Sequence, residues 1–210
     1  MTSHIIVLPG GGYIRHAPHE GEPVVEWLSS LGHAASTFIY PVKARHPQTL
    51  DAVSAEIRRV RATGVDRVGL LGFSAGGHAA GLAALTSTER VDAAILCYPV
   101  VSMLLETHAG SRENLIGLDA APALREATSL EKLVTPSAPP FFVWHTAEDA
   151  SVPVEHSYLL GSALAEHGVP HSLHVFPKGR HGIGLAQGEG TAEAWTALAG
   201  MWLSELDWAG

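Results

Sequence analysis

The stretch Gly72 to Gly77 constrains the fold more than any other part of the chain. It contains G-x-S-x-G, after the apolar run 68–71 and before a run of small, helix-prone residues at 78–85. Strand, G-x-S-x-G and helix in this order are typical of a nucleophile elbow, a sharp turn that lifts one serine clear of a sheet. Gly72 and Gly76 would relieve the crowding, because a Cβ at either position would meet the neighbouring strand or helix. The sequence therefore predicts Ser74 at the tip of the turn, at a helix N-terminus that favours developing negative charge.

A glycine-rich turn between strand and helix also occurs in nucleotide-binding proteins. The chain lacks G-x-x-x-x-G-K-[ST], and no G-x-G-x-x-G opens its first helix. These absences favour the nucleophile elbow over a nucleotide site.

Composition narrows the function classes. The 210 residues carry a formal net charge of −8 with no block of like charges, which favours solubility and gives no sign of nucleic-acid binding. The single cysteine, Cys97, excludes an intrachain disulfide and is expected in the core. No run approaches the ~18 apolar residues of a membrane span, and Met1 to His4 lack the basic start of a leader. We therefore expect a cytoplasmic protein, unless a leader was removed.

Apolar runs and helical spacing alternate along the chain. Strands are predicted at residues 5–8, 34–40, 68–71, 91–98, 141–144 and 172–176. Helices are predicted at residues 20–31, 49–63, 78–85 and 155–167, and a last helix follows Thr191, which can cap it. This alternation predicts a mostly parallel sheet of about six strands in a three-layer α/β/α sandwich. We expect one domain over residues 1–210.

Residues 100–139 interrupt this pattern as an irregular insertion. Turn residues recur there, and only 124–127 and 130–134 suggest helix. An insertion of this length either shapes a pocket over Ser74 or is a surface excursion, and the sequence leaves both open. His108, Ser111 and Asn114 are its polar candidates, with no predicted role.

Chemistry is expected where the strands end, because functional groups of a parallel sheet gather beyond its carboxyl ends. Four strands deliver to that edge a triple glycine starting at Gly10, Ser74, Asp149 and His181. A serine hydroxyl needs a base, an imidazole serves near neutral pH, and a carboxylate holds the imidazole tautomer. The order Ser…Asp…His accompanies this elbow. We predict Ser74 as nucleophile, His181 as base and Asp149 as acid.

Two further points concern the groups around this trio. Glu148 is the alternative acid, since it is adjacent to Asp149 and either carboxylate can serve. The N–H groups of Gly11, Gly12 and Ala75 are predicted to bind an oxyanion, where one lost donor typically costs ~3 kcal/mol. The triple glycine taken alone could equally be a flexible loop.

Two histidine clusters superficially suggest a metal site. His16, His19 and Glu20 are interpreted as surface histidines and an acid at a helix start. His167 and His171 are separated by a glycine and a proline, which break the helix that such ligand spacing needs. We expect neither a metal nor a cofactor.

Five segments carry a more specific signal: LPGGGY at 8–13, HEGE at 19–22, GFSAGGH at 72–78, WHTAED at 144–149 with VP at 152–153, and HVFPKGRHG at 174–182. Together they resemble bacterial α/β-hydrolase esterases of the acetylxylan-esterase-like, lid-poor group. The resemblance implies a minimal α/β-hydrolase fold without a large cap, with Ser74, Asp149 and His181 in the roles given above. It also implies hydrolysis of short-chain, often acetyl, esters of carbohydrates. The chain departs from the family at Pro9, where many relatives have histidine, and at residues 40–64, which are short beside relatives and could trim the pocket.

The expected activity is that of a serine carboxylesterase acting on a small-molecule ester through an acyl-enzyme. A peptidase, thioesterase or lactonase could use the same residues, because pocket walls select the acyl chain and the leaving group. A non-catalytic binding protein on the same scaffold is a third hypothesis. Neither nucleic acid nor membrane is expected as a partner, and a homodimer stays open.

Overall fold

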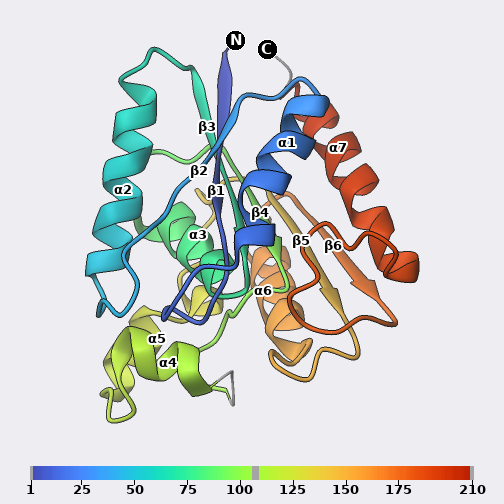
Figure 1. Cartoon of the computed structure of the whole chain (residues 1–210). Coiled ribbons are helices and arrows are strands. Elements are labelled where there is room, and N and C mark those ends of the chain that lie inside the picture. The colour runs from blue at the N-terminus through green and yellow to red at the C-terminus, as the bar shows by residue number, and fades with distance from the viewer. Residues whose placement is uncertain (1, 106–108, 209–210) are drawn as a thin grey trace.

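The sheet at the centre of the fold has six strands, and every pair of neighbours is parallel. The computed structural model describes residues 2–105 and 109–208, and within them the strand order is β2-β1-β3-β4-β5-β6 (Figure 1). The strands are β1 (Ser3–Leu8), β2 (Ala35–Thr37), β3 (Arg67–Phe73), β4 (Ala93–Cys97), β5 (Phe141–Thr146) and β6 (His171–Phe176). The predicted parallel sheet is confirmed.

Helices cover both faces of this sheet. The α-helices are α1 (Glu22–Ser30), α2 (Gln48–Arg61), α3 (Ser74–Thr86), α4 (Ala109–Ile116), α5 (Pro122–Ala127), α6 (Glu155–Glu166) and α7 (Trp195–Glu205). The 3-10 turns are η1 (Pro18–Glu20), η2 (Leu130–Lys132) and η3 (Gly190–Ala194). Helices α1 and α7 lie on one face and α2, α3 and α6 on the other, while α4 and α5 lie beyond the carboxyl ends of the strands (Figure 1). The predicted three-layer architecture is confirmed.

Successive side chains of the central strands enter two apolar clusters, one on each face of the sheet. In β1, Ile6 and Leu8 pack in the cluster that includes α2 and α3, whereas Ile5 and Val7 pack in the cluster that includes α1 and α7. Neighbouring side chains of a strand point to opposite faces, so a strand covered on both sides must be apolar throughout. This requirement explains why the strands are continuous apolar runs in the sequence.

The second strand is shorter than predicted. The sequence predicts strand over residues 34–40, but β2 ends at Thr37. Beyond it, the Tyr40 hydroxyl donates to the Pro9 carbonyl at 2.7 Å, and the Tyr40 ring packs edge-on against Tyr13. The contacts of Tyr40 beneath the glycine loop outweigh the strand preference of the residues after Thr37, because strand preferences depend on packing.

Two helix starts also differ from prediction. The helix predicted over 20–31 begins at Glu22, after the separate turn η1. Thr191 lies inside η3 and caps nothing, because α7 begins at Trp195 without a side-chain cap. Trp195 is fully buried and stacks on Trp144 with ring centroids 5.1 Å apart, so a tertiary contact, which no local capping signal reveals, fixes where α7 starts.

The insertion at 100–139 contains more helix than predicted. Helices α5 and η2 fall on the two expected pieces, but α4 was not predicted. Its buried apolar side chains, Leu115 and Ile116, lie together at one end, so they produce no helical periodicity in the sequence. His108 lies outside the described residues.

The structure also bears on Cys97 and on membrane-spanning helices. Cys97 is free and buried, as predicted. Among residues 2–105 and 109–208, no helix has both the length and the apolar character needed to cross a membrane.

Candidate active site

A sharp turn places Ser74 at the junction of β3 and α3. Its backbone φ is +52°, in the left-handed region that residues other than glycine rarely adopt. A Cβ on Gly72 would lie 2.3 Å from the Gly76 carbonyl oxygen, and a Cβ on Gly76 would lie 2.2 Å from the Leu8 carbonyl oxygen. Both distances are shorter than any tolerated contact, so the turn needs glycine at both positions. The predicted strand–elbow–helix geometry is confirmed.

Two loops bring His181 and Asp149 to this serine. Asp149 follows β5 and His181 follows β6, at the same edge of the sheet. The Ser74 hydroxyl lies 2.8 Å from Nε2 of His181, and Nδ1 of His181 lies 2.6 Å from Oδ2 of Asp149. Because a carboxylate can only accept, Nδ1–H donates to Asp149, and Nε2 is left to accept from Ser74. In this arrangement His181 can accept the hydroxyl proton while the Ser74 oxygen attacks an electrophile.

The Asp149 carboxylate is fixed on both oxygens. Oδ1 accepts the N–H groups of Ser151 at 2.8 Å and Val152 at 2.9 Å, and Oδ2 lies 3.3 Å from Nε2 of buried His145. Burial raises the pKa of Asp149, but hydrogen bonds from His145 and His181 outweigh it and hold the pKa below its usual value. The group is therefore ionised at neutral pH and can stabilise a protonated His181.

Glu148, the alternative acid, is exposed and has no hydrogen bond or ion pair to a described residue. The carboxylate that contacts His181 is that of Asp149.

The glycine loop after β1 lies next to the serine. Gly11, Gly12 and Ser74 line one cavity, and Ala75 is the second residue of α3. Within residues 2–105 and 109–208, the N–H groups of Gly11 and Gly12 have no acceptor, and the first N–H groups of a helix have none within it. These donors are available to an oxygen atom of a bound molecule.

Glu20, interpreted from the sequence as an acid at a helix start, lies in η1 just before α1 and is buried. Its side chain is 2% exposed; Oε2 accepts the Gly10 N–H at 2.8 Å, and Oε1 accepts the Tyr98 hydroxyl at 2.6 Å. The Tyr98 hydroxyl in turn accepts the Gly184 N–H at 2.8 Å, and its ring packs on His181 with centroids 5.0 Å apart. Glu20 thus connects the glycine loop to the loop that carries His181. No local sequence pattern could have indicated that this acid points inward.

A second buried network supports the other side of the glycine loop. Nδ1 of His78 accepts the Tyr13 hydroxyl at 2.7 Å, and Nε2–H donates to the Thr128 carbonyl at 2.7 Å. Burial lowers the pKa of His78 to about 4, so the ring is neutral and this tautomer is fixed. Asn114 of α4, which had no predicted role, donates from Nδ2 to the Gly12 carbonyl at 2.9 Å. The insertion therefore contacts the site directly.

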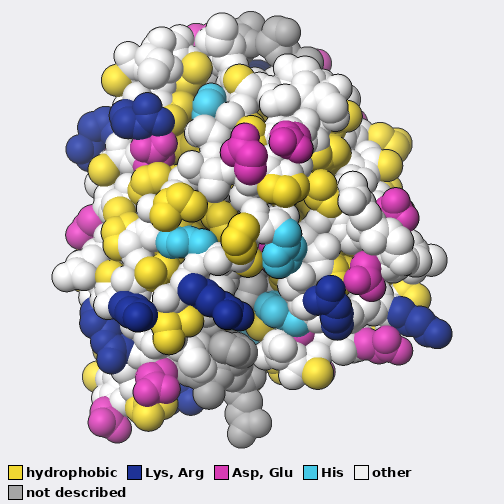
Figure 2. Space-filling view, in the orientation of Figure 1, with side chains coloured by type: hydrophobic (Ala, Val, Ile, Leu, Met, Phe, Trp, Pro, Cys, Tyr) yellow, Lys and Arg dark blue, Asp and Glu magenta, His cyan; other side chains and the backbone are white. Residues whose placement is uncertain are grey.

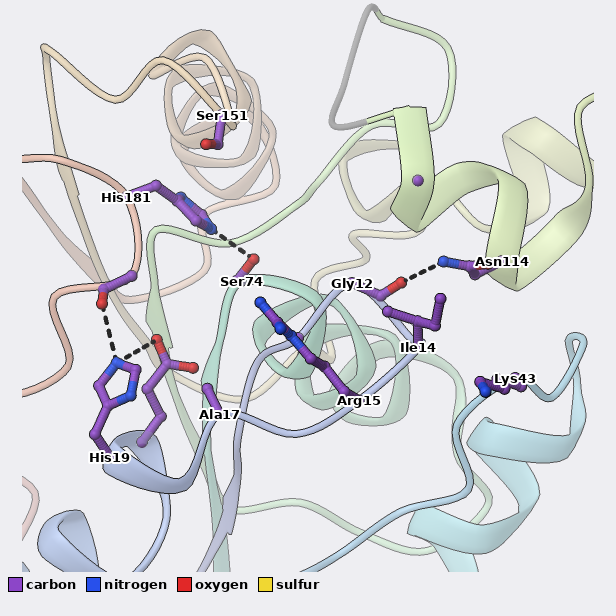
Figure 3. Close-up of a pocket in the computed structure, with 14 residues that line it drawn as sticks. Gly12, Ile14, Arg15, Ala17, His19, Lys43, Ser74, Asn114, Ser151 and His181 are labelled. Atoms are coloured by element: carbon purple, nitrogen blue, oxygen red, sulfur yellow. Dashed lines mark hydrogen bonds and ion pairs between the residues drawn. The ribbon is translucent and has the colours of Figure 1, made fainter.

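The cavity above Ser74 has a volume of about 830 Å³ (Figure 3). Its walls come from the glycine loop, η1, the His181 loop and α4. Such a volume is in the range of small-molecule sites. His181 and Ser74 face each other across one side of it, and Asn114 reaches Gly12 on another (Figure 3).

The histidine clusters are engaged in other contacts. Nε2–H of His19 donates to the Gly182 carbonyl at 3.0 Å, and the His16 ring packs edge-on against Tyr40. His167 and His171 each contact a backbone carbonyl through Nδ1. In the part of the chain that the structure describes, no three His, Cys, Asp or Glu side chains are arranged to hold a metal ion.

Comparison with known proteins places this geometry in context. Residues 44–205 match the model of the prolyl oligopeptidase family. The chain is 36% identical over 211 residues to endo-1,4-beta-xylanase B of Butyrivibrio fibrisolvens, covering 88% of this chain and 33% of that protein. It is 31% identical over 198 residues to the acetylxylan esterase of Xylanibacter ruminicola, covering 86% of this chain and 41% of that protein. The chain therefore spans well under half the length of these two curated relatives.

The chain also resembles solved structures. The acetyl ester-xyloside bifunctional hydrolase from Caldicellulosiruptor lactoaceticus superposes with a TM-score of 0.96 at 41% identity. The match covers 100% of this chain and 85% of that one.

Proposed function

We propose, from the premise that this chain belongs to the prolyl oligopeptidase family of α/β-hydrolases, that it is a serine hydrolase of short-chain, above all acetyl, carboxylic esters. The observation that carries the proposal is the hydrogen-bonded series Ser74–His181–Asp149 beside an open cavity. The names of two relatives, which refer to acetylxylan and to an acetyl ester-xyloside, support an acetyl ester as the substrate. The xylanase name carries less weight, because the chain covers only 33% of that protein.

The proposed reaction begins with attack by Ser74 Oγ on the ester carbonyl carbon while Nε2 of His181 accepts the hydroxyl proton. The carbonyl oxygen becomes an oxyanion that accepts the N–H groups of Gly11, Gly12 and Ala75. Asp149 keeps Nδ1 of His181 protonated and stabilises the imidazolium. His181 then protonates the departing alcohol, and an acyl group stays on Ser74.

Hydrolysis of this acyl-enzyme repeats the same steps with water. His181 accepts a proton from the water as it attacks the acyl carbon, and the oxyanion occupies the same three donors. His181 returns the proton to Ser74, and the carboxylic acid leaves. The cycle consumes one water and needs neither a metal nor a cofactor.

A peptidase is the second candidate, because the matching family is described by its peptidase members. Ester and amide substrates share the acyl-enzyme and differ in the leaving group. A thioesterase, a lactonase and a non-catalytic binding protein are also tested by the same assays.

The test compares turnover of 4-nitrophenyl acetate by the wild type and by Ser74→Ala. We expect a loss of at least about 10³-fold, because removal of a nucleophile leaves only the contribution of binding and the oxyanion donors. Ser204→Ala, a serine on α7 whose hydroxyl donates to the Gly200 carbonyl, is the matched control and should keep full activity. Activity that survives Ser74→Ala would reject the assignment.

Substrate class follows from a second series of assays. Acetyl, butyryl and octanoyl esters, acetylated xylo-oligosaccharides, an acetyl thioester, a lactone and a prolyl 4-nitroanilide are compared by kcat/KM. The proposal requires acetyl esters to be the best substrates. A preference for the anilide would instead establish the peptidase.

A further inference from the structure

Arg15 differs from every other arginine of the chain. All ten arginines lie among the described residues, and nine of them make at least one hydrogen bond or ion pair from the guanidinium. Arg15 makes neither with any described residue. Its five N–H donors are therefore not occupied by a partner within residues 2–105 and 109–208.

The unpaired guanidinium lies in the cavity that contains Ser74. The Arg15 N–H donates to the Gly11 carbonyl at 3.2 Å, which attaches the residue to the glycine loop. From there the side chain points into the cavity on the side of Ser74 (Figure 3). Lys43, a second cation, lines the same cavity and is attached to the same loop, since its N–H donates to the Tyr13 carbonyl at 2.7 Å.

No acid of the described cavity wall neutralises these two cations. Glu20 is the one carboxylate among the described lining residues, and its oxygens already accept from Gly10 and Tyr98. Its side chain is 2% exposed and makes no ion pair with Arg15. In a chain of net charge −8, the cavity mouth is thus locally basic. Figure 2 shows Lys and Arg side chains across the lower half of the molecule, in the orientation of Figure 1, along with Asp and Glu side chains nearer its lower edge.

We propose that the ester substrate carries an anionic group, a carboxylate, which Arg15 binds while Ser74 attacks the ester bond. The proposal rests on the proposed function and deepens it. A guanidinium matches a carboxylate with two parallel N–H donors, and both cations of the cavity attract the same charge. The carboxylate belongs to the alcohol, as in an acetylated uronic acid. A carboxylate on the acyl group, as in a half-ester of a dicarboxylic acid, would replace acetyl as the acyl group and is the alternative that the test separates.

The experiment uses two matched pairs of esters. On the alcohol side the pair is 4-acetoxybenzoate and its methyl ester. On the acyl side it is mono-4-nitrophenyl glutarate and its methyl ester, with spontaneous hydrolysis subtracted. For each pair, the ratio of kcat/KM for the anionic ester to kcat/KM for the neutral ester is measured in the wild type, Arg15→Gln, Arg15→Lys and Lys43→Gln.

We expect Arg15→Gln to lower this ratio about three- to tenfold in one pair, because the contact is charge-assisted but partly exposed to solvent. Arg15→Lys keeps the charge but loses the two parallel N–H donors of the guanidinium, so its ratio should lie between those of the wild type and Arg15→Gln. Lys43→Gln should have a smaller effect, and raising the salt from 0.05 to 0.5 M should reduce the wild-type ratio. The pair that responds identifies which part of the substrate carries the anion.

Arg58→Gln removes the same charge from α2, where Arg58 pairs with Glu89, and should leave both ratios unchanged. Equal losses for the anionic and the neutral esters in Arg15→Gln would overturn the proposal, and so would unchanged ratios in both pairs. In these two outcomes the neutral esters are still hydrolysed by the wild type, so the proposed function stands. If the wild type hydrolyses none of the four esters, the proposed function fails and this inference fails with it.

Discussion

Glu20 shows how one residue can position two loops of a site at once. Its carboxylate accepts one N–H from the glycine loop, at Gly10, and one hydroxyl from Tyr98, which itself holds the His181 loop at Gly184. A buried donor left without an acceptor costs about 1–3 kcal/mol. Changing Glu20 would therefore disturb the proposed oxyanion donors and the proposed base together, although Glu20 itself takes no proton in the proposed reaction.

Glu20→Gln is expected to lower kcat for 4-nitrophenyl acetate about tenfold and to lower the melting temperature. Glutamine has nearly the same size, but its amide NH₂ would face one of the two donors, so one buried hydrogen bond is lost. Glu22→Gln, the exposed neighbour at the start of α1, is the matched control and should behave as the wild type. Equal kcat values in the two variants would show that the network does not position the site.

Asp149→Asn is expected to lower kcat about 10³- to 10⁴-fold with little change in KM. The amide cannot favour the Nδ1–H tautomer of His181, so Nε2 no longer accepts from Ser74. Glu148→Gln, next to it and exposed, should keep at least half of the activity. The reverse result would identify Glu148 as the acid, the alternative that the sequence left open.

At the scale of secondary structure, the elements with strong internal patterns were predictable and those fixed by tertiary contacts were not. β1 and β3 are continuous apolar runs because both faces of the sheet are covered, and α2 shows its buried stripe at Val53, Ile57 and Val60. α4 has no such stripe, and the start of α7 is set by the burial of Trp195.

The site followed the same division. The positions of Ser74, Asp149 and His181 could be predicted, because each lies at the end of a strand that the apolar pattern identifies or in the loop that follows it. Glu20, Tyr98 and His78 could not, because their roles depend on which way a side chain points after distant segments pack together.

Asn114 permits a test of how α4 contributes. Asn114→Ala removes the hydrogen bond to the Gly12 carbonyl, so the glycine loop loses this contact with α4. We expect kcat/KM for 4-nitrophenyl acetate to fall three- to tenfold, as for loss of one hydrogen bond of about 1 kcal/mol. Glu113→Ala, on the exposed side of the same helix, is the control and should have no effect. Equal values would mean that α4 does not hold the loop.

For the molecule as a whole, buried and half-buried histidines connect stability to pH. Burial lowers the pKa of His78 to about 4, and the pKa values of His4, His33 and His174 are also lowered, with burial as the largest cause. The unfolded chain binds these protons near pH 6.5, whereas the folded chain binds them only at lower pH. Between the pKa of each histidine in the folded chain and its pKa in the unfolded chain, the unfolded state holds more protons. The free energy of unfolding therefore decreases as the pH falls.

We expect the free energy of unfolding, measured in urea, to be highest above about pH 6.5 and to decrease down to about pH 4. His78 alone accounts for roughly 3 kcal/mol of this decrease, from the difference between 6.5 and about 4. His78→Gln should be less stable at pH 7 but should lose less stability on acidification. If the free energy of unfolding of His78→Gln fell with decreasing pH as steeply as that of the wild type, the role of His78 in this pH dependence would be contradicted.

The central claim is that Ser74, and no other serine, is the nucleophile. The most direct measurement is intact-mass spectrometry after treatment with a fluorophosphonate, followed by mapping of the labelled peptide. We predict one adduct per chain in the wild type, on the peptide that contains Ser74. Ser74→Ala should form no adduct, and Asp149→Asn should form it at a reduced rate. An unlabelled protein, or an adduct on a different serine, would contradict the claim.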